Sequence, residues 1–306
     1  MNFIPFMQMA RQRRYWAPQR LGRVVWSIAS NLRGQIELFR IFSLPVFRSL
    51  VLLDPIFLFR HLSRDFLFRG LSAKERTASI LHHYRFLLSR ISDYLLRQSG
   101  PWEIPLMEHR KNGIDFSVTL GLPSKYALFE GESLLQLFVD GVPVYGIQFT
   151  IVPGWVLHSE QRDVVFVQRL QGVKGCFEQV SAATSAFSDV APPLLLMTVL
   201  QGIAAAWGIR EIACISAQSQ YGSKFHNDDR SSALIRRAYD EFFLELGAAR
   251  VSADFFSLSL PVEGKPIEAI GNGHKARTRR KRVFRDEIAN RVCQTILEAA
   301  ESSCGS

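Results

Sequence analysis

The chain has 306 residues, of which 47% are hydrophobic, and a formal net charge of +9. This composition is typical of one large or two ordinary folded domains and excludes disorder as the overall state. The four cysteines form no C-x-x-C pair, which argues against a zinc site or a disulfide framework and fits a reducing, cytoplasmic compartment. The apolar start is followed by arginines, the reverse of a secretory signal, and no apolar run is long enough to span a bilayer.

The positive charge lies at the two ends of the chain. Residues 1–70 contain eleven arginines, no lysine and three acids, a balance of +8. Residues 275–285 contain seven basic residues and no acid, so the rest of the chain has a balance of −6. We therefore predict a basic, aromatic, helical segment over residues 1–70 and an α/β domain over residues 71–306. No specific nucleic-acid-binding motif accompanies the charge.

The N-terminal segment holds twelve aromatic residues. Ile36, Phe39 and the run 41–44 recur at helical spacing, and Pro45 and Pro55 divide the rest of the segment into short helical pieces. Two interpretations remain open. The segment lies on an anionic membrane surface, with aromatic side chains in the headgroup region and arginines on phosphates, or it packs on the main domain with its arginines in water.

The middle of the chain predicts one long helix followed by strands. Ser72 and Glu75 form a capping box ahead of an apolar pattern of helical period, which predicts a helix over 73–96. Four short runs rich in β-forming residues come next, at 114–120, 134–139, 144–150 and 164–170. Asp140 and Gly141 mark a hairpin turn between two of them. We expect an antiparallel meander of about four strands.

The remaining elements alternate between helices and strands. We predict helices over 177–187, 194–207 and 229–246, strands over 211–216 and 251–260, and a final helix from the basic run to about residue 300. The expected fold class is α+β, with a mixed, largely antiparallel sheet flanked by helices and a helical N-terminal extension.

Several residue sets are candidates for chemistry, each with a plain structural alternative. Gln171, Gly172, Lys174 and Gly175 lie between a strand and a helix, where backbone amides can hold a phosphate, or where the chain simply turns. His158 with Glu160, and His226 with Asp228 and Asp229, are acid/base candidates in polar loops, where such residues are also common. Cys214 lies in an apolar strand and is expected in the core. No metal site is expected.

The basic run near the C-terminus has two interpretations of its own. It is either an anion-binding helix start or the solvated face of the final helix. The candidate anion-binding residues are Lys275, Arg277, Arg279, Arg280 and Arg282.

A string of short motifs resembles the VirK/YbjX family of Gram-negative bacteria. The motifs lie at 130–134, 170–172, 193–196, 207–209, 239–242, 246–247 and 274–282. The resemblance covers most of the chain from about Leu71 to Cys293. It implies an envelope-associated protein linked to virulence, surface-protein expression or resistance to cationic peptides. It transfers no catalytic residue.

A fainter resemblance is to the GNAT acyltransferase superfamily, in which a strand meander leads into a glycine loop, a helix, a strand and a helix bearing Asn and Tyr. Here 170–175 takes the place of the loop, and Asn227 with Tyr239 the last helix. The pattern departs at Lys174, which stands where a small residue is usual, and at an additional helix before Pro192.

This second resemblance implies acyl-coenzyme A as the cofactor. The loop amides and Lys174 would hold its pyrophosphate, and Tyr239 would protonate the leaving thiolate. The strands that flank Gly172 must diverge for this enzymatic function. The alternative is a non-catalytic factor in the cytoplasm, peripheral to the inner membrane and recruited to it through residues 1–70.

Overall fold

The computed structural model describes residues 31–53, 55–97, 103–123, 130–222, 229–262, 271, 273 and 275–301. The predictions that involve His226, Asn227 and Asp228, and those for residues 1–30 of the N-terminal segment, lie outside the described residues.

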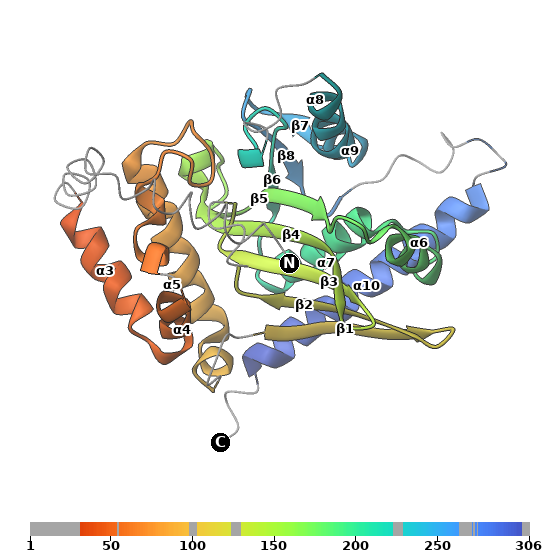
Figure 1. Cartoon of the computed structure of the whole chain (residues 1–306), viewed down its shortest axis with the longest axis horizontal. Coiled ribbons are helices and arrows are strands. Elements are labelled where there is room, and N and C mark those ends of the chain that lie inside the picture. Colours follow the sequence, from red (N-terminus) through yellow and green to blue (C-terminus); the bar gives the residue numbers. More distant parts are fainter. Residues whose placement is uncertain are drawn as a thin grey trace.

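An eight-stranded sheet forms the centre of the molecule, in the order β1-β2-β3-β4-β5-β6-β8-β7 (Figure 1). Its strands are β1 (Glu103–Lys111), β2 (Ile114–Gly121), β3 (Ser133–Val139), β4 (Val142–Pro153), β5 (Asp163–Gly172), β6 (Glu211–Ile215), β7 (Ala249–Arg250) and β8 (Phe255–Ser259). All neighbouring strands are antiparallel except β5 and β6, which are parallel. The predicted fold class, α+β with a mixed and largely antiparallel sheet flanked by helices, is confirmed.

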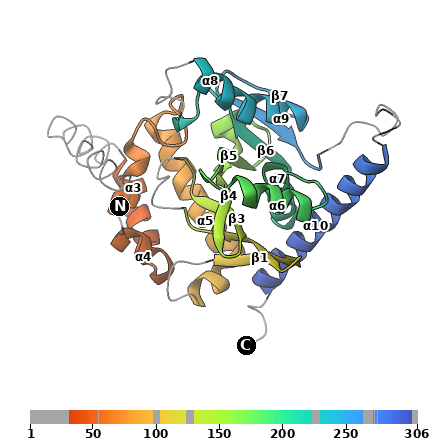
Figure 2. The same ribbon diagram turned by 45° about the vertical axis from the view of Figure 1, so that its right-hand side comes forward.

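Three groups of helices surround the sheet (Figures 1 and 2). The first group consists of α6 (Phe177–Ala186), α7 (Pro192–Ala206) and α10 (Lys275–Glu301); α7 packs on the sheet, and both α6 and α10 contact α7. The second lies beside the sheet and consists of α3 (Leu32–Phe42), α4 (Pro45–Leu53), the short helices η1 (Pro55–Leu58) and η2 (Arg60–Leu62), and α5 (Ala73–Arg97). A third cluster, α8 (Asp229–Arg236), η5 (Arg237–Glu241) and α9 (Phe242–Glu245), lies near β7 and β8.

Local sequence explains most element boundaries. The Ser72 hydroxyl accepts the Glu75 N–H at 3.2 Å, and the Glu75 carboxylate accepts the Ser72 N–H at 2.6 Å, so the capping box that begins α5 is confirmed. Asp140 and Gly141 have φ values of 48° and 73°, as the predicted turn between β3 and β4 requires. Along β3 the side chains alternate between buried and half-buried, because successive side chains point to opposite faces of the sheet and α7 packs on this strand.

Two strand predictions were incomplete. The meander has five strands rather than about four, because β1 is a polar edge strand with a register shift between Pro105 and Met107 that breaks its period. The strand predicted over residues 251–260 is shorter in the structure. The N–H groups of Val251 and Ser252 turn back to the Phe255 carbonyl, so β8 begins at residue 255 and pairs with the short β7.

The described part of the N-terminal segment is built into the main core. Phe42, Phe47, Phe57 and Phe66 are buried in the same hydrophobic cluster as the sheet. The interpretation that this segment packs on the main domain is therefore confirmed for residues 31–53 and 55–70. Its membrane contact remains a prediction.

A buried ion pair fixes the segment to the sheet. Arg60 of η2 and Glu132, just before β3, form an ion pair whose two side chains are completely buried. The Tyr84 hydroxyl of α5 donates to the Glu132 carboxylate at 2.6 Å. Arg60 also lies over the Phe57 ring, 4.2 Å from its centroid. Three separate parts of the chain thus meet at one carboxylate.

Candidate active site at the diverging strands

The parallel strands β5 and β6 stay together for only three residue pairs. Val165 to Val167 pair with Ile212 to Cys214, after which β5 continues to Gly172 while β6 ends at Ile215. A register shift accompanies the separation, since Gln148 of β4 opposes Arg169 whereas the next residue of β4 opposes Val167. Gln168 is the additional residue of this bulge. Beyond residue 167, β5 therefore continues to Gly172 with β4 on one side and without β6 on the other, and we refer to this point as the divergence.

Tyr239 lies at the divergence. It belongs to η5, a π-helical turn inside the predicted helix 229–246, and such turns are frequent at functional sites. Its side chain is buried, and its hydroxyl oxygen accepts the Leu170 N–H at 3.1 Å. Burial raises the pKa of Tyr239, so the hydroxyl is protonated at neutral pH. The phenol is thus protonated, with one backbone amide directed at its oxygen.

The predicted glycine loop joins β5 to α6. The Val173 N–H donates a hydrogen bond to the Val144 carbonyl at 2.8 Å. Gly175 has a φ of 90°, a value that favours glycine. The first helical bond runs from the Val180 N–H to the Cys176 carbonyl, so the amides of residues 177–179 have no acceptor within α6. Lys174 is exposed at this end of the helix, and Glu178, also exposed, brings a negative charge to it.

Gly172 lies close to a side chain of the neighbouring strand. A Cβ atom there would lie 3.1 Å from the ring of Tyr145 on the neighbouring strand. The ring of Tyr145 is thus held against the last residue of β5. The additional helix predicted before Pro192 is present as α6, so the crossover from β5 to β6 contains two helices.

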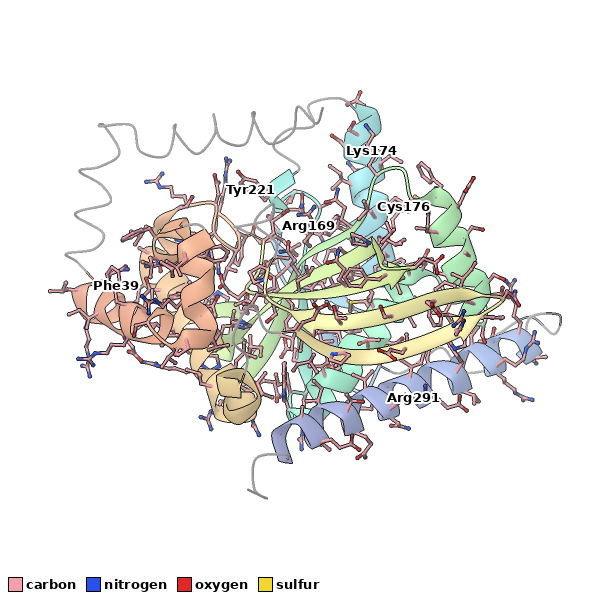
Figure 3. The ribbon with its side chains drawn as sticks, turned by 60° about the horizontal axis from the view of Figure 1, so that its bottom comes forward. Phe39, Arg169, Lys174, Cys176, Tyr221 and Arg291 are labelled. Carbon is pink, nitrogen blue, oxygen red and sulfur yellow. The ribbon has the colours of Figure 1, made fainter. Side chains whose placement is uncertain are left out.

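A buried carboxylate cluster at the same place was not predicted from sequence. Glu130 accepts from Arg169 at 3.0 Å and from the Gln220 amide. Glu130 and Gln220 are each 6% exposed. Figure 3 shows Arg169 and Tyr221 together in the middle of the molecule. Glu130 and Arg169 also act electrostatically on Tyr239, which places the cluster within range of the phenol.

Gln148, opposite Arg169 on β4, has an unusual environment. It is 1% exposed, and neither its amide oxygen nor its amide nitrogen has a hydrogen-bond partner. Unpaired buried amide groups are costly, and each one calls for an explanation such as a ligand.

Glu130 belongs to the motif at 130–134 that carries the VirK/YbjX resemblance. Its contacts with Arg169 and Gln220 had no sequence signal, because these residues lie 39 and 90 positions away along the chain.

The C-terminal basic run is confirmed as helical and forms the first part of α10. Two of its side chains have different partners. Arg277 pairs with Asp189 at 2.9 Å, and Arg285 donates to the Thr198 hydroxyl of α7 at 3.1 Å. Burial, followed by the nearby Arg277, lowers the pKa of Lys281. The anion-binding role of Lys275, Arg277, Arg279, Arg280 and Arg282 stays a prediction.

Other candidates from the sequence lie away from this site. Cys214 is fully buried in β6, and burial raises the pKa of its thiol, which confirms it as a core residue. His158 is exposed at the end of the short helix η3 (Gly154–Leu157), and its charge acts on Glu75. In the described ranges, no three His, Cys, Asp or Glu side chains are grouped so that they could hold a metal ion. None of the helices described here has the length and hydropathy needed to cross a membrane.

Fold and site together define a mixed-sheet α+β protein. Among the described strands it has a single parallel pair, which ends beside a buried tyrosine, and a glycine loop follows the longer strand of that pair. The chain belongs to the family described as Protein of unknown function (DUF535), whose model matches residues 29–294. Among solved structures, a variant of a cAMP-binding acyltransferase from Mycobacterium smegmatis matches with 12% identity and a TM-score of 0.28, over 69% of this chain and 59% of that one. No curated protein matches.

Proposed function

We propose that this protein transfers an acyl group from an acyl-coenzyme A thioester to a nucleophilic acceptor. The observation that carries the proposal is the divergence of β5 from β6, with the Tyr239 hydroxyl inside it and the loop 171–175 at its end. The resemblance to VirK/YbjX proteins favours an envelope-related acceptor, and the GNAT resemblance favours an amine such as that of an aminoacyl group.

Binding of the cofactor would use the strand–loop–helix junction. The open amides of residues 177–179 and the N-terminal end of α6 favour a pyrophosphate, as does the ammonium group of Lys174. Glu178 opposes it. The backbone N–H groups would therefore orient the pyrophosphate, and Lys174 would supply most of the positive charge that attracts it.

The chemical step needs a proton at the departing sulfur. The acceptor attacks the thioester carbonyl, a new C–N or C–O bond forms and the C–S bond breaks. Tyr239 donates its hydroxyl proton to the thiolate and receives the proton that the acceptor loses, so it is regenerated. The Leu170 N–H stabilises the transient phenolate, because it already donates to that oxygen.

The acceptor side would be formed by the cluster of Glu130, Arg169 and Gln148. The unpaired amide of Gln148 can donate to and accept from a polar acceptor. The carboxylate of Glu130, neutralised by Arg169, adds polarity without a free charge. The polar environment formed by these three side chains favours a small polar nucleophile over an apolar one.

The test is a thiol-release assay with acetyl-coenzyme A and a panel of primary amines and aminoacyl compounds. Tyr239→Phe removes the proton donor while keeping the ring, so the rate should fall by about 10²- to 10⁴-fold. Arg291→Gln, an exposed change on α10, is the control and should keep the wild-type rate. If Tyr239→Phe and wild type release thiol equally fast, Tyr239 is not the donor.

A second candidate function, attachment to an anionic membrane surface, is favoured by the outer face of α3. Leu32, Ile36 and Phe39 follow one another at helical spacing and are each more than 40% exposed. Arg33 and Arg40 are exposed beside them. Figure 3 shows Phe39 at the outer edge of the molecule. Such a stripe can enter a headgroup region while its arginines meet lipid phosphates.

Flotation of the full chain with anionic vesicles tests this candidate. A deletion up to Leu71 is unsuitable, because it would remove Arg60 and leave Glu132 buried without its cation. Changing Leu32, Ile36 and Phe39 together to Gln should abolish flotation. Changing the equally exposed Leu234 and Leu244 to Gln is the control. Equal flotation of both variants would sink the assignment to α3.

A further inference from the structure

A second site lies at the opposite end of β5 from the glycine loop. The ten residues of β5 place its two ends on the order of 30 Å apart. At the Asp163 end there is a hollow of about 310 Å³ between α5 and the corner at the end of β4. Lys74, Leu81, His82 and Arg85 line it on the α5 side, and Pro153 and Trp155 line it on the other.

Trp155 forms an aromatic wall on a closely packed turn. Its side chain is 51% exposed, which is unusual for so large an apolar group. The Gly154 N–H donates to the Arg162 carbonyl at 3.0 Å, and the Gly154 carbonyl accepts the Ser159 N–H at 3.0 Å. A Cβ at Gly154 would lie 1.7 Å from the Gln161 carbonyl oxygen, so only glycine allows this closure. The indole is therefore presented by a fixed backbone.

The charges around the hollow leave a positive excess. Asp163 is paired with His82 at 2.7 Å, and Glu37 is paired with Arg85. No acidic side chain lines the hollow within the described part of the chain. Lys74 has no ion-pair partner among these described residues, so it is available to an anion.

His82 adds a directional polar group. Its Nε2 bonds to the Asp163 carboxylate, which can only accept, so Nε2 carries the proton and Nδ1 is a free acceptor. Burial lowers the pKa of His82, although Asp163 opposes this, and a neutral ring keeps that acceptor. The hollow thus combines an aromatic face, a cation and an acceptor.

We propose that this hollow binds a planar aromatic anion of the size of a nucleoside monophosphate, with its ring stacked on Trp155 and its anionic group on Lys74. The volume is at the lower end of the range for small-molecule sites. Leu81 and Pro153 supply apolar contacts for the ring edge. The proposal is independent of the acyl-transfer site.

Calorimetric titration of the full chain with adenosine 5′-monophosphate tests it. We expect saturable one-site binding, with adenosine and ribose 5-phosphate each binding at least tenfold more weakly, because each lacks one half of the recognised group. Trp155→Ala and Lys74→Gln should each weaken binding at least tenfold. Both side chains are exposed, so these variants should fold, which thermal unfolding checks.

The matched controls are Phe177→Ala, an exposed aromatic at the other end of β5, and Arg291→Gln, an exposed cation on α10. Both should bind the monophosphate as the wild type does. Three results would each overturn the proposal: no binding at low millimolar concentration, equal affinity for ribose 5-phosphate, or equal weakening in the control variants.

Discussion

Glu130 and Glu132 are two residues apart, and each is buried and paired with an arginine, yet their surroundings differ. Glu132 is fully enclosed between Arg60 and Tyr84. Glu130 pairs with Arg169, whose side chain is 27% exposed, and lies within electrostatic range of Tyr239. The first carboxylate ties a remote segment to the sheet. The second stands beside the point where β6 ends and β5 continues, and the arginine that pairs with it is partly exposed to solvent.

The residue between them explains how they are kept apart. Gly131 has a φ of 140°, and a Cβ there would lie 2.8 Å from the Phe149 nitrogen on β4. The chain therefore runs close against β4, and the two flanking carboxylates reach different partners. A structural ion pair and a candidate site can thus be neighbours in sequence without sharing a role.

The largest expected effect is at the enclosed pair. Arg60→Met leaves Glu132 buried without a cation, which should cost about 3–5 kcal/mol of unfolding free energy. Chemical denaturation measures it. The exposed pair of Arg69 and Asp65 is the control, and Arg69→Met should cost about 1 kcal/mol or less. A loss at Arg60 as small as that at Arg69 would contradict the structural role.

An effect of similar size concerns pH. Burial, with Arg60 and Arg76 adding to it, lowers the pKa of His61 to about 3, whereas the unfolded chain titrates near the ordinary value of 6.5. As pH falls, His61 therefore takes up its proton in the unfolded chain before it does so in the folded protein. The unfolding free energy should fall as pH drops from 6.5 toward 3, by about 1.4 kcal/mol per pH unit for this residue.

His61→Gln should reduce that slope when denaturation is measured between pH 4 and pH 7, a range of about three units. Part of the slope should remain in this variant, because burial also lowers the pKa of His83. The exposed His109→Gln is the control and should leave the slope as in the wild type. An unchanged slope in His61→Gln would show that the imidazole is charged in the folded protein.

The smallest effect on stability is expected at the open pair. Glu130→Gln keeps the size and the acceptor for Gln220, and Arg169 is partly solvated, so the change should cost about 1 kcal/mol. The rate of thiol release should nevertheless fall at least tenfold if the cluster serves the acceptor. A variant that is as stable and as active as the wild type would remove Glu130 from the site.

Much of the fold can be predicted from local sequence signals. The capping box at Ser72, the turn at Gly141 and the proline start of α7 each act within a few residues, and each is present as predicted. The edge strand β1 and the π-helical turn at Tyr239 gave no such signal, since tertiary contacts decide both.

The candidate site was predictable only in part. The loop and Tyr239 could be named because they keep a recognisable chain order. The cluster of Glu130, Arg169 and Gln220 could not, because its contacts bridge three distant segments. The hollow at Trp155 was missed for the same reason, since α5 and the end of β4 meet only in the folded chain.

The most direct test of acyl transfer is calorimetric titration of the full chain with acetyl-coenzyme A. We predict saturable one-site binding that weakens several-fold in Lys174→Gln and strengthens in Glu178→Gln, because these charges flank the loop. Binding should be unchanged in Arg291→Gln. The absence of binding at high micromolar concentration, or equal weakening in Lys174→Gln and Arg291→Gln, would contradict the account.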